Sequence, residues 1–153
     1  MLLASALIGF ASGSRTFLAI ALTAWAVSFG WVDTGVTFFD WLGAPALAAV
    51  LTLLAFGELY GDKQPQMGAR TRFPALLARL LAGGIAGGAL AAGADMAWLG
   101  VGMGAGAALI GTFATYRMRK WLAGRLGRDL PAALFEDALT LLLAVAALAL
   151  IAS

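Results

Sequence analysis

The chain has 153 residues, of which 62% are hydrophobic and only 12% are charged, and its net charge is +2. Soluble domains are roughly half apolar and about a quarter charged, so this composition excludes an ordinary soluble domain and indicates a polytopic α-helical membrane protein. The chain contains no cysteine and no histidine, which excludes disulfides, thiolate chemistry and the usual general base. We expect no cofactor and no nucleic-acid partner.

Residues 1–30 form the first apolar segment, which is long enough to cross a membrane because a span needs about 20 residues. It lacks the basic start of a secretory signal, so we expect it to be retained. Arg15 lies at its centre, and an arginine inside a bilayer costs roughly 2.5–3.5 kcal/mol on insertion scales. Arg15 should therefore face protein or water. The sequence G-S-R-T at 13–16 leaves two forms open: a continuous span, or two half-helices that re-enter near Gly13 to Arg15 and line a cavity.

The remaining elements follow from prolines, glycines and charges. Residues 31–41 contain aspartates with tryptophan at both ends, which predicts an interfacial loop. The residues from Tyr116 onward alternate basic and apolar side chains at helical spacing, which predicts a helix lying on the membrane surface. We therefore expect a single transmembrane domain over residues 1–153, an all-α bundle of about five segments. The predicted segments are 1–30, 44–60, 73–97, 100–116 and 131–152, with an interfacial basic helix at 117–128.

Charge placement predicts the orientation. The connections 61–72 and 117–130 hold lysine and arginine, whereas the other connections hold Asp33, Asp40 and Asp95 and no basic residue. By the positive-inside rule the basic connections face the cytoplasm, here of a bacterial inner membrane. A continuous first span would place the N-terminus inside the cell, and a re-entrant first segment would place it outside.

Two prolines predict a buried charged cluster. Arg79 follows Pro74 by five residues and Glu136 follows Pro131 by five residues. If both prolines open helices at the cytoplasmic face, these charges lie at a similar depth, roughly 7–9 Å into the membrane. Glu58, near the end of its segment, reaches the same layer. We expect Glu58, Arg79, Glu136 and Asp137 to form this cluster, with Arg15 pointing into it.

These charges support more than one chemistry. The carboxylates of Glu58, Asp62, Glu136 and Asp137 would suit a hard cation such as Mg²⁺, or would only neutralise neighbouring arginines. Arginine guanidinium groups would clamp a phosphate or carboxylate, or would anchor lipid head groups. The candidate ligand-binding or pathway residues are Arg15, Glu58, Asp62, Lys63, Arg70, Arg72, Arg79, Arg117, Glu136 and Asp137.

Glycines spaced by four residues predict close helix contacts. The pairs are Gly9 and Gly13, Gly83 and Gly87, Gly84 and Gly88, Gly100 and Gly104, and Gly102 and Gly106. Such contacts form within one chain or between chains, and we expect a homo-oligomer embedded in the lipid bilayer.

A motif in the middle of the chain carries a resemblance. G-E-L-Y-G-D-K-Q-P at 57–65 is followed by R-T-R-F-P at 70–74 and by Arg79, and G-S-R-T stands near the start. This pattern resembles an uncharacterised family of small bacterial integral membrane proteins, a domain of unknown function, over most of the chain. An aliphatic residue usually stands in that family where this chain has Gln64. The resemblance implies no activity, and it singles out Arg15, Glu58, Asp62, Lys63, Pro65, Arg70, Pro74 and Arg79 for testing.

Three functions fit these features. The first is a small transporter or channel with a charged site open to the cytoplasm, for an anionic solute or lipid head group. The second is a membrane enzyme acting on a phosphate-bearing lipid with Mg²⁺, although the chain has no catalytic signature of known enzymes of that kind. The third is a non-catalytic scaffold in which the charged cluster is structural.

Overall fold

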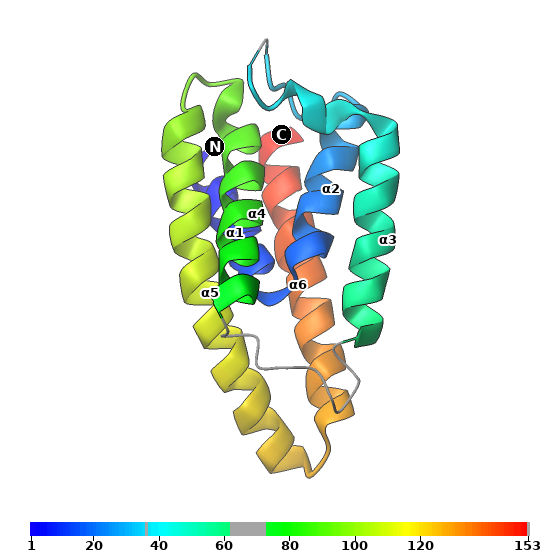
Figure 1. Ribbon diagram of the computed structural model, residues 1–153. Helices are drawn as coiled ribbons and strands as arrows, with labels where there is room; N and C mark the ends of the chain where they lie inside the picture. The colour runs from blue at the N-terminus through cyan, green and yellow to red at the C-terminus, as the bar shows by residue number, and fades with distance from the viewer. Residues whose placement is uncertain (36, 62–72, 153) are drawn as a thin grey trace.

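The computed structural model describes residues 1–35, 37–61 and 73–152. Within these ranges the chain is helical and contains no strand, in agreement with the predicted fold class. The helices pack into an elongated bundle (Figure 1). They are α1 (Leu2–Ser14), α2 (Thr16–Ser28), the 3₁₀ turn η1 (Asp40–Gly43), α3 (Pro45–Gly61), α4 (Phe73–Ala92), α5 (Ala97–Leu126) and α6 (Asp129–Ala152).

The first apolar segment is broken into two half-helices at Arg15. The backbone of Arg15 is extended, with φ −132° and ψ 102°, and α1 and α2 have 13 residues each. Ser5 and Ser12 of α1 donate hydrogen bonds to carbonyl groups of Gly87 and Arg79, so α1 runs antiparallel to α4. The chain then turns, and α2 returns to the end where both termini lie (Figure 1). Of the two forms left open by the sequence, the structure has the one with two half-helices.

Fewer helices than the predicted five segments are long enough to cross a membrane. Among the described residues, α4, α5 and α6 have the length and apolar composition of a membrane span. The helices α1 and α2, at about 1.5 Å per residue, measure only about 20 Å each against a hydrocarbon core of about 30 Å. The helix α3 has 17 residues, which is at the lower limit of the usual length of a span.

The predicted surface helix at 117–128 does not form as a separate element, so that prediction is wrong. The helix α5 runs without interruption through the predicted span and the basic segment, and it ends where Gly127 adopts a left-handed φ of 65°. The alternation of basic and apolar residues reflects the two sides of this segment, because one side packs against α6 while the other is exposed. The helix α6 begins at Asp129, so Pro131 lies in its first turn, where proline is tolerated.

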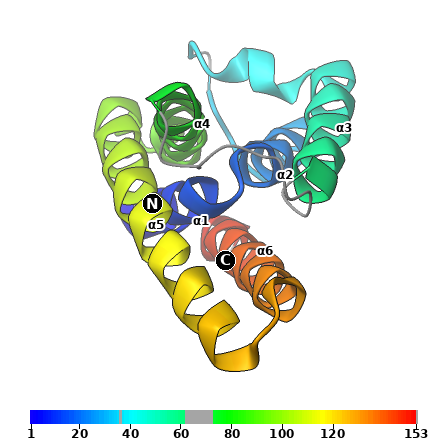
Figure 2. The ribbon, with the colours of Figure 1, turned by 60° about the horizontal axis from the view of Figure 1, so that its bottom comes forward.

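Glycines bring α1, α4 and α5 into direct backbone contact. A Cβ atom built on Gly104 would lie 2.1 Å from the carbonyl oxygen of Gly83, and one built on Gly9 would lie 2.2 Å from the carbonyl oxygen of Gly104. No side chain fits at these positions. Most of the predicted small-residue contacts therefore form within the chain, whereas Gly102 and Gly106 face open space. This packing places α1 at the centre of the bundle when it is viewed from one end (Figure 2).

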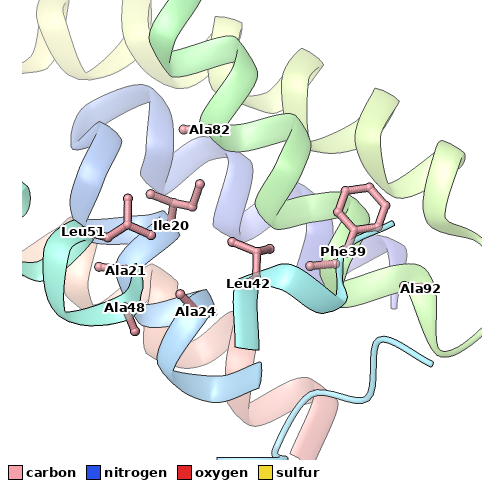
Figure 3. Close-up of a cluster of buried hydrophobic side chains, with 10 residues drawn as sticks. Ile20, Ala21, Ala24, Phe39, Leu42, Ala48, Leu51, Ala82 and Ala92 are labelled. Carbon is pink, nitrogen blue, oxygen red and sulfur yellow. The ribbon is translucent and has the colours of Figure 1, made fainter. Parts of the chain in front are cut away.

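A second packing contact joins α2 to α3, α4 and η1. Ile20, Leu51 and Ala82 meet between these helices, while Phe39 and the fully buried Leu42 of η1 cover the end of the cluster (Figure 3). The outer surface of the bundle is also apolar: Leu53 is 71% exposed, and Ile110 and Leu142 are each 65% exposed. Large exposed apolar side chains on several helices fit a surface that contacts lipid.

Candidate functional site

Charged side chains gather around the turn between α1 and α2, in the interior of the bundle. Arg15 and Glu136 are completely buried, and Arg79 is 4% exposed. We call the set formed by Arg15, Glu58, Arg79, Arg119, Glu136 and Asp137 the charged cluster. Its residues come from the α1–α2 turn and from α3, α4, α5 and α6.

Arg79 closes the C-terminal end of α1. Its Nη1 atom donates hydrogen bonds to the carbonyl oxygens of Gly13 and Ser14, the latter at 2.8 Å. The last carbonyl groups of a helix lack partners within the helix and form the negative end of its dipole. A buried guanidinium group therefore satisfies both the hydrogen bonding and the charge of this end. Ser12 donates in return to the carbonyl oxygen of Arg79 over 3.1 Å.

Glu58 closes the N-terminal end of α2 in the opposite sense. Its two carboxylate oxygens accept hydrogen bonds from the backbone N–H groups of Thr16 and Phe17, each at 2.9 Å. A carboxylate suits this end because the free N–H groups carry partial positive charge. Glu58 Oε1 also lies 3.8 Å from Arg79 Nη2. The two caps of the broken segment therefore attract each other.

Arg15, the residue at the turn itself, pairs with Asp137 of α6. Arg15 Nε donates to Asp137 Oδ1 over 2.7 Å, and Nη2 approaches the same oxygen to 2.5 Å. The Arg15 side chain is fully buried, whereas the Asp137 side chain is 18% exposed. Asp137 is therefore the member of this pair that is accessible from outside the bundle.

Glu136 is held by hydroxyl groups and by Arg119. Ser14 Oγ donates to Glu136 Oε1 over 2.9 Å, and Arg119 Nη1 lies 3.4 Å from Glu136 Oε2. Thr140 Oγ1 lies 2.8 Å from both Ser14 Oγ and the carbonyl oxygen of Glu136, and its single proton serves one of them at a time. Arg119 binds the exposed Asp129 at the same time, with Nε 2.9 Å from Oδ1.

Arg79 and Glu136 lie at the same level of the bundle. Arg79 and Glu136 both bind Ser14, one through its carbonyl oxygen and one through its hydroxyl group, so they lie in one layer. The structure brings together five of the predicted site residues: Arg15, Glu58, Arg79, Glu136 and Asp137.

Other predicted site residues lie elsewhere. Asp62, Lys63, Arg70 and Arg72 are outside the described residues. Arg117 is exposed on the outer side of α5, away from the cluster. No group of three or more acidic, histidine or cysteine side chains that could hold a metal ion occurs in the described ranges. Of the carboxylates proposed for Mg²⁺, the three that the structure describes, Glu58, Glu136 and Asp137, face arginine side chains.

Sequence reasoning missed Arg119, Ser14 and Thr140. The sequence places Arg119 on the predicted surface helix, whereas its side chain turns inward to Glu136 because α5 continues past the predicted break. The sequence signal for the position of Arg119 is Asp129, which follows Gly127. The chain reverses between α5 and α6, so Asp129 at the start of α6 lies alongside α5.

Comparison with known proteins gives a family and no activity. A family model described as "Domain of unknown function (DUF4126)" matches residues 2–151. No curated protein and no solved structure matches the chain. Since the match spans nearly the whole chain, this protein belongs to the DUF4126 family of unknown function.

Proposed function

We propose that this protein is a small membrane transporter or channel-like protein that moves an anionic solute or a lipid head group past the charged cluster. The observation that carries this proposal is the break at Arg15, which holds a fully buried arginine inside a bundle of apolar helices. Charged residues within membrane segments are costly and commonly mark substrate or ion pathways. Interrupted helices build many transporter sites for the same physical reason, since their free backbone groups need polar partners.

The chemistry of Arg15 favours an anion as the ligand. A guanidinium group binds carboxylates and phosphates through two parallel hydrogen bonds. Asp137 occupies this position in the structure, and it is the more exposed member of the pair. In our proposal an anion replaces Asp137 at Arg15, and the carboxylate returns when the anion leaves. Transport then requires an exchange of partners and no net creation of buried charge.

The proposed placement in the membrane follows the hairpin. We propose that α3 to α6 cross a bacterial cytoplasmic membrane and that α1 and α2 dip into it from one side. The basic C-terminal part of α5 then faces the cytoplasm by the positive-inside rule, and both termini lie outside. A homo-oligomer is sterically allowed, because Gly102 and Gly106 face open space on α5.

Flux measurements on proteoliposomes test the transport proposal. The purified protein, reconstituted in lipid vesicles, is offered a panel of small carboxylates and phosphates, and their uptake is followed. Arg15→Gln should lower the flux of the transported anion at least tenfold, while Arg15→Lys should retain part of it because the charge remains.

The matched variant Asp137→Asn removes the competing carboxylate with little change of shape. We expect it to lower the KM for the anion. Uptake that is indifferent to both Arg15→Gln and Asp137→Asn in folded protein would contradict the proposal.

A second function, a non-catalytic membrane scaffold, is favoured by a different observation. Glu58 and Arg79 are engaged with the backbone of the two half-helix ends, which is a structural use of charge. In a scaffold the charged cluster only fixes the hairpin in the bundle. Wild-type vesicles would then show no uptake of any anion in the panel, and the cluster variants would alter stability alone.

A further inference from the structure

The C-terminal part of α5 extends beyond the length that a bilayer core requires. The helix has 30 residues, or about 45 Å at 1.5 Å per residue, against a hydrocarbon core of about 30 Å. Together with α6 it reaches past the end of α3 and past the α1–α2 turn (Figure 1). In a protein that crosses the membrane through α5, this last part of the helix lies at the level of the lipid head groups.

The basic residues of this part divide between two sides of the helix. Arg119 points to α6, where it binds Asp129 and Glu136. Arg117, two residues earlier and thus on the opposite side of a helix with 3.6 residues per turn, is exposed. Lys120 and Arg125 are exposed on that same outer side. In the part of the chain that the structure describes, none of these three outer cations forms an ion pair with a carboxylate.

An aromatic ring and a glycine complete this surface. Trp121 is 59% exposed, and the guanidinium carbon of Arg125 lies 4.9 Å from the centre of its ring. Tryptophan is enriched where a membrane protein passes from hydrocarbon to water. Gly124, one turn after Lys120 and Trp121, has nothing within 4 Å of the position of a Cβ atom. An exposed glycine in a helix interior costs stability, and here no packing contact requires it. We call the surface formed by Arg117, Lys120, Trp121, Gly124 and Arg125 the outer basic face.

We propose that the outer basic face binds the phosphate head groups of anionic phospholipids. Three cations without carboxylate partners give the charge complementarity, Trp121 fixes the depth, and Gly124 leaves room for a phosphate close to the helix. The proposal rests on the membrane location in the proposed function and is independent of transport. The proposal gives the arginines of α5 two roles. Arg119 belongs to the charged cluster, whereas Arg117 and Arg125 bind lipid.

Native mass spectrometry of the detergent-solubilised full chain tests the proposal. The protein is equilibrated with equal amounts of phosphatidylglycerol and phosphatidylcholine, and the ratio of the two lipids that remain bound is measured. We expect the unaltered protein to prefer phosphatidylglycerol. Each basic residue near an anionic lipid surface contributes about a fivefold preference, so Arg117→Gln/Lys120→Gln/Arg125→Gln should lower the ratio at least about tenfold. The charge-preserving variant Arg117→Lys/Arg125→Lys should keep most of it.

Two further measurements locate the effect. Gly124→Leu retains every charge and fills the open space, so it should reduce phosphatidylglycerol binding without changing phosphatidylcholine binding. Salt should weaken the preference of the unaltered protein, because these charges are exposed. Inorganic phosphate competing as well as the lipid would show that a free anion is the ligand and would overturn the proposal. A folded triple variant with an unchanged lipid ratio would overturn it too, as would a preference insensitive to salt.

Discussion

At the scale of single residues, charged side chains in this protein provide hydrogen bonds to the backbone. Interrupting a helix leaves carbonyl and N–H groups without partners, and inside a membrane each such group costs several kcal/mol. Arg79 and Glu58 supply these partners at the two ends of the break. Each side chain also carries the sign of charge that the adjoining helix end favours. The break at Arg15 is therefore stable only together with residues from α3 and α4.

A neutral substitution at Glu58 tests this role. Glu58→Gln keeps the size of the side chain but replaces a carboxylate that caps α2 and faces Arg79. We expect the free energy of unfolding in detergent to fall by about 1.5–3 kcal/mol, the usual worth of hydrogen bonds to a charged group. Asp95→Asn is the matched control, because Asp95 is exposed and its φ of 57° suits asparagine. Equal effects of the two substitutions would argue against the capping role.

Sequence reasoning reached some of these residues and not others, for a physical reason. The distances from Pro74 to Arg79 and from Pro131 to Glu136 predict a common depth, because helical rise is constant. To predict which neighbouring helix a side chain faces, one must also know how far its own helix continues. Helical spacing places Arg117 and Arg119 on opposite sides, but only the packing of α5 against α6 shows that Arg119 is the one that meets Glu136.

At the scale of elements, α5 presents two kinds of glycine. Gly104 lies against the backbones of α1 and α4, whereas Gly106, two residues later, faces open space. Spacing in the sequence identifies both as positions for close helix approach, but it cannot tell which is used within the chain. The same limit applies to G-S-R-T at 13–16, where a glycine before a buried arginine permits a straight helix or a break. The caps supplied by Glu58 of α3 and Arg79 of α4 favour the break.

Alanine substitutions on α5 measure this difference. Gly104→Ala places a Cβ atom 2.1 Å from a backbone oxygen of α4, and the overpacking should lower the free energy of unfolding by about 2 kcal/mol or more. Gly106→Ala on the same helix should be neutral or stabilise by up to about 1 kcal/mol, because alanine favours helix and meets no neighbour. Thermal or denaturant unfolding of both variants in the same detergent gives the comparison, and a Gly104→Ala protein as stable as Gly106→Ala would contradict the packing.

At the scale of the whole molecule, the hairpin sets the position of the termini. Both lie at the end of the bundle that carries Asp33, Asp40 and Asp95, while the basic part of α5 lies at the other end (Figure 1). The segment count of five would have placed the termini at opposite ends. That count fails because hydrophobic length alone does not distinguish one long helix from two short ones that fold back.

The chain contains no cysteine, so single cysteines test the orientation directly. We expect two cysteines to react with an impermeant maleimide added outside intact cells. One is introduced by Asp95→Cys, and the other is in a short N-terminal tag. Arg128→Cys should react only after the membrane is opened. Labelling of the tag and of position 95 from opposite sides of the membrane would rule out the re-entrant hairpin.

The pairing of Arg15 with Asp137 also has a consequence for synthesis. The two residues are separated by 122 positions, so a ribosome must add 122 residues after Arg15 before this partner exists. Other hydrogen bonds of the first two helices also reach α3, α4 and α6. The half-helices therefore leave the ribosome before the residues that hold them in place. Their packing is therefore completed only after α6 has been made, and a nascent chain halted before α6 lacks this partner of Arg15.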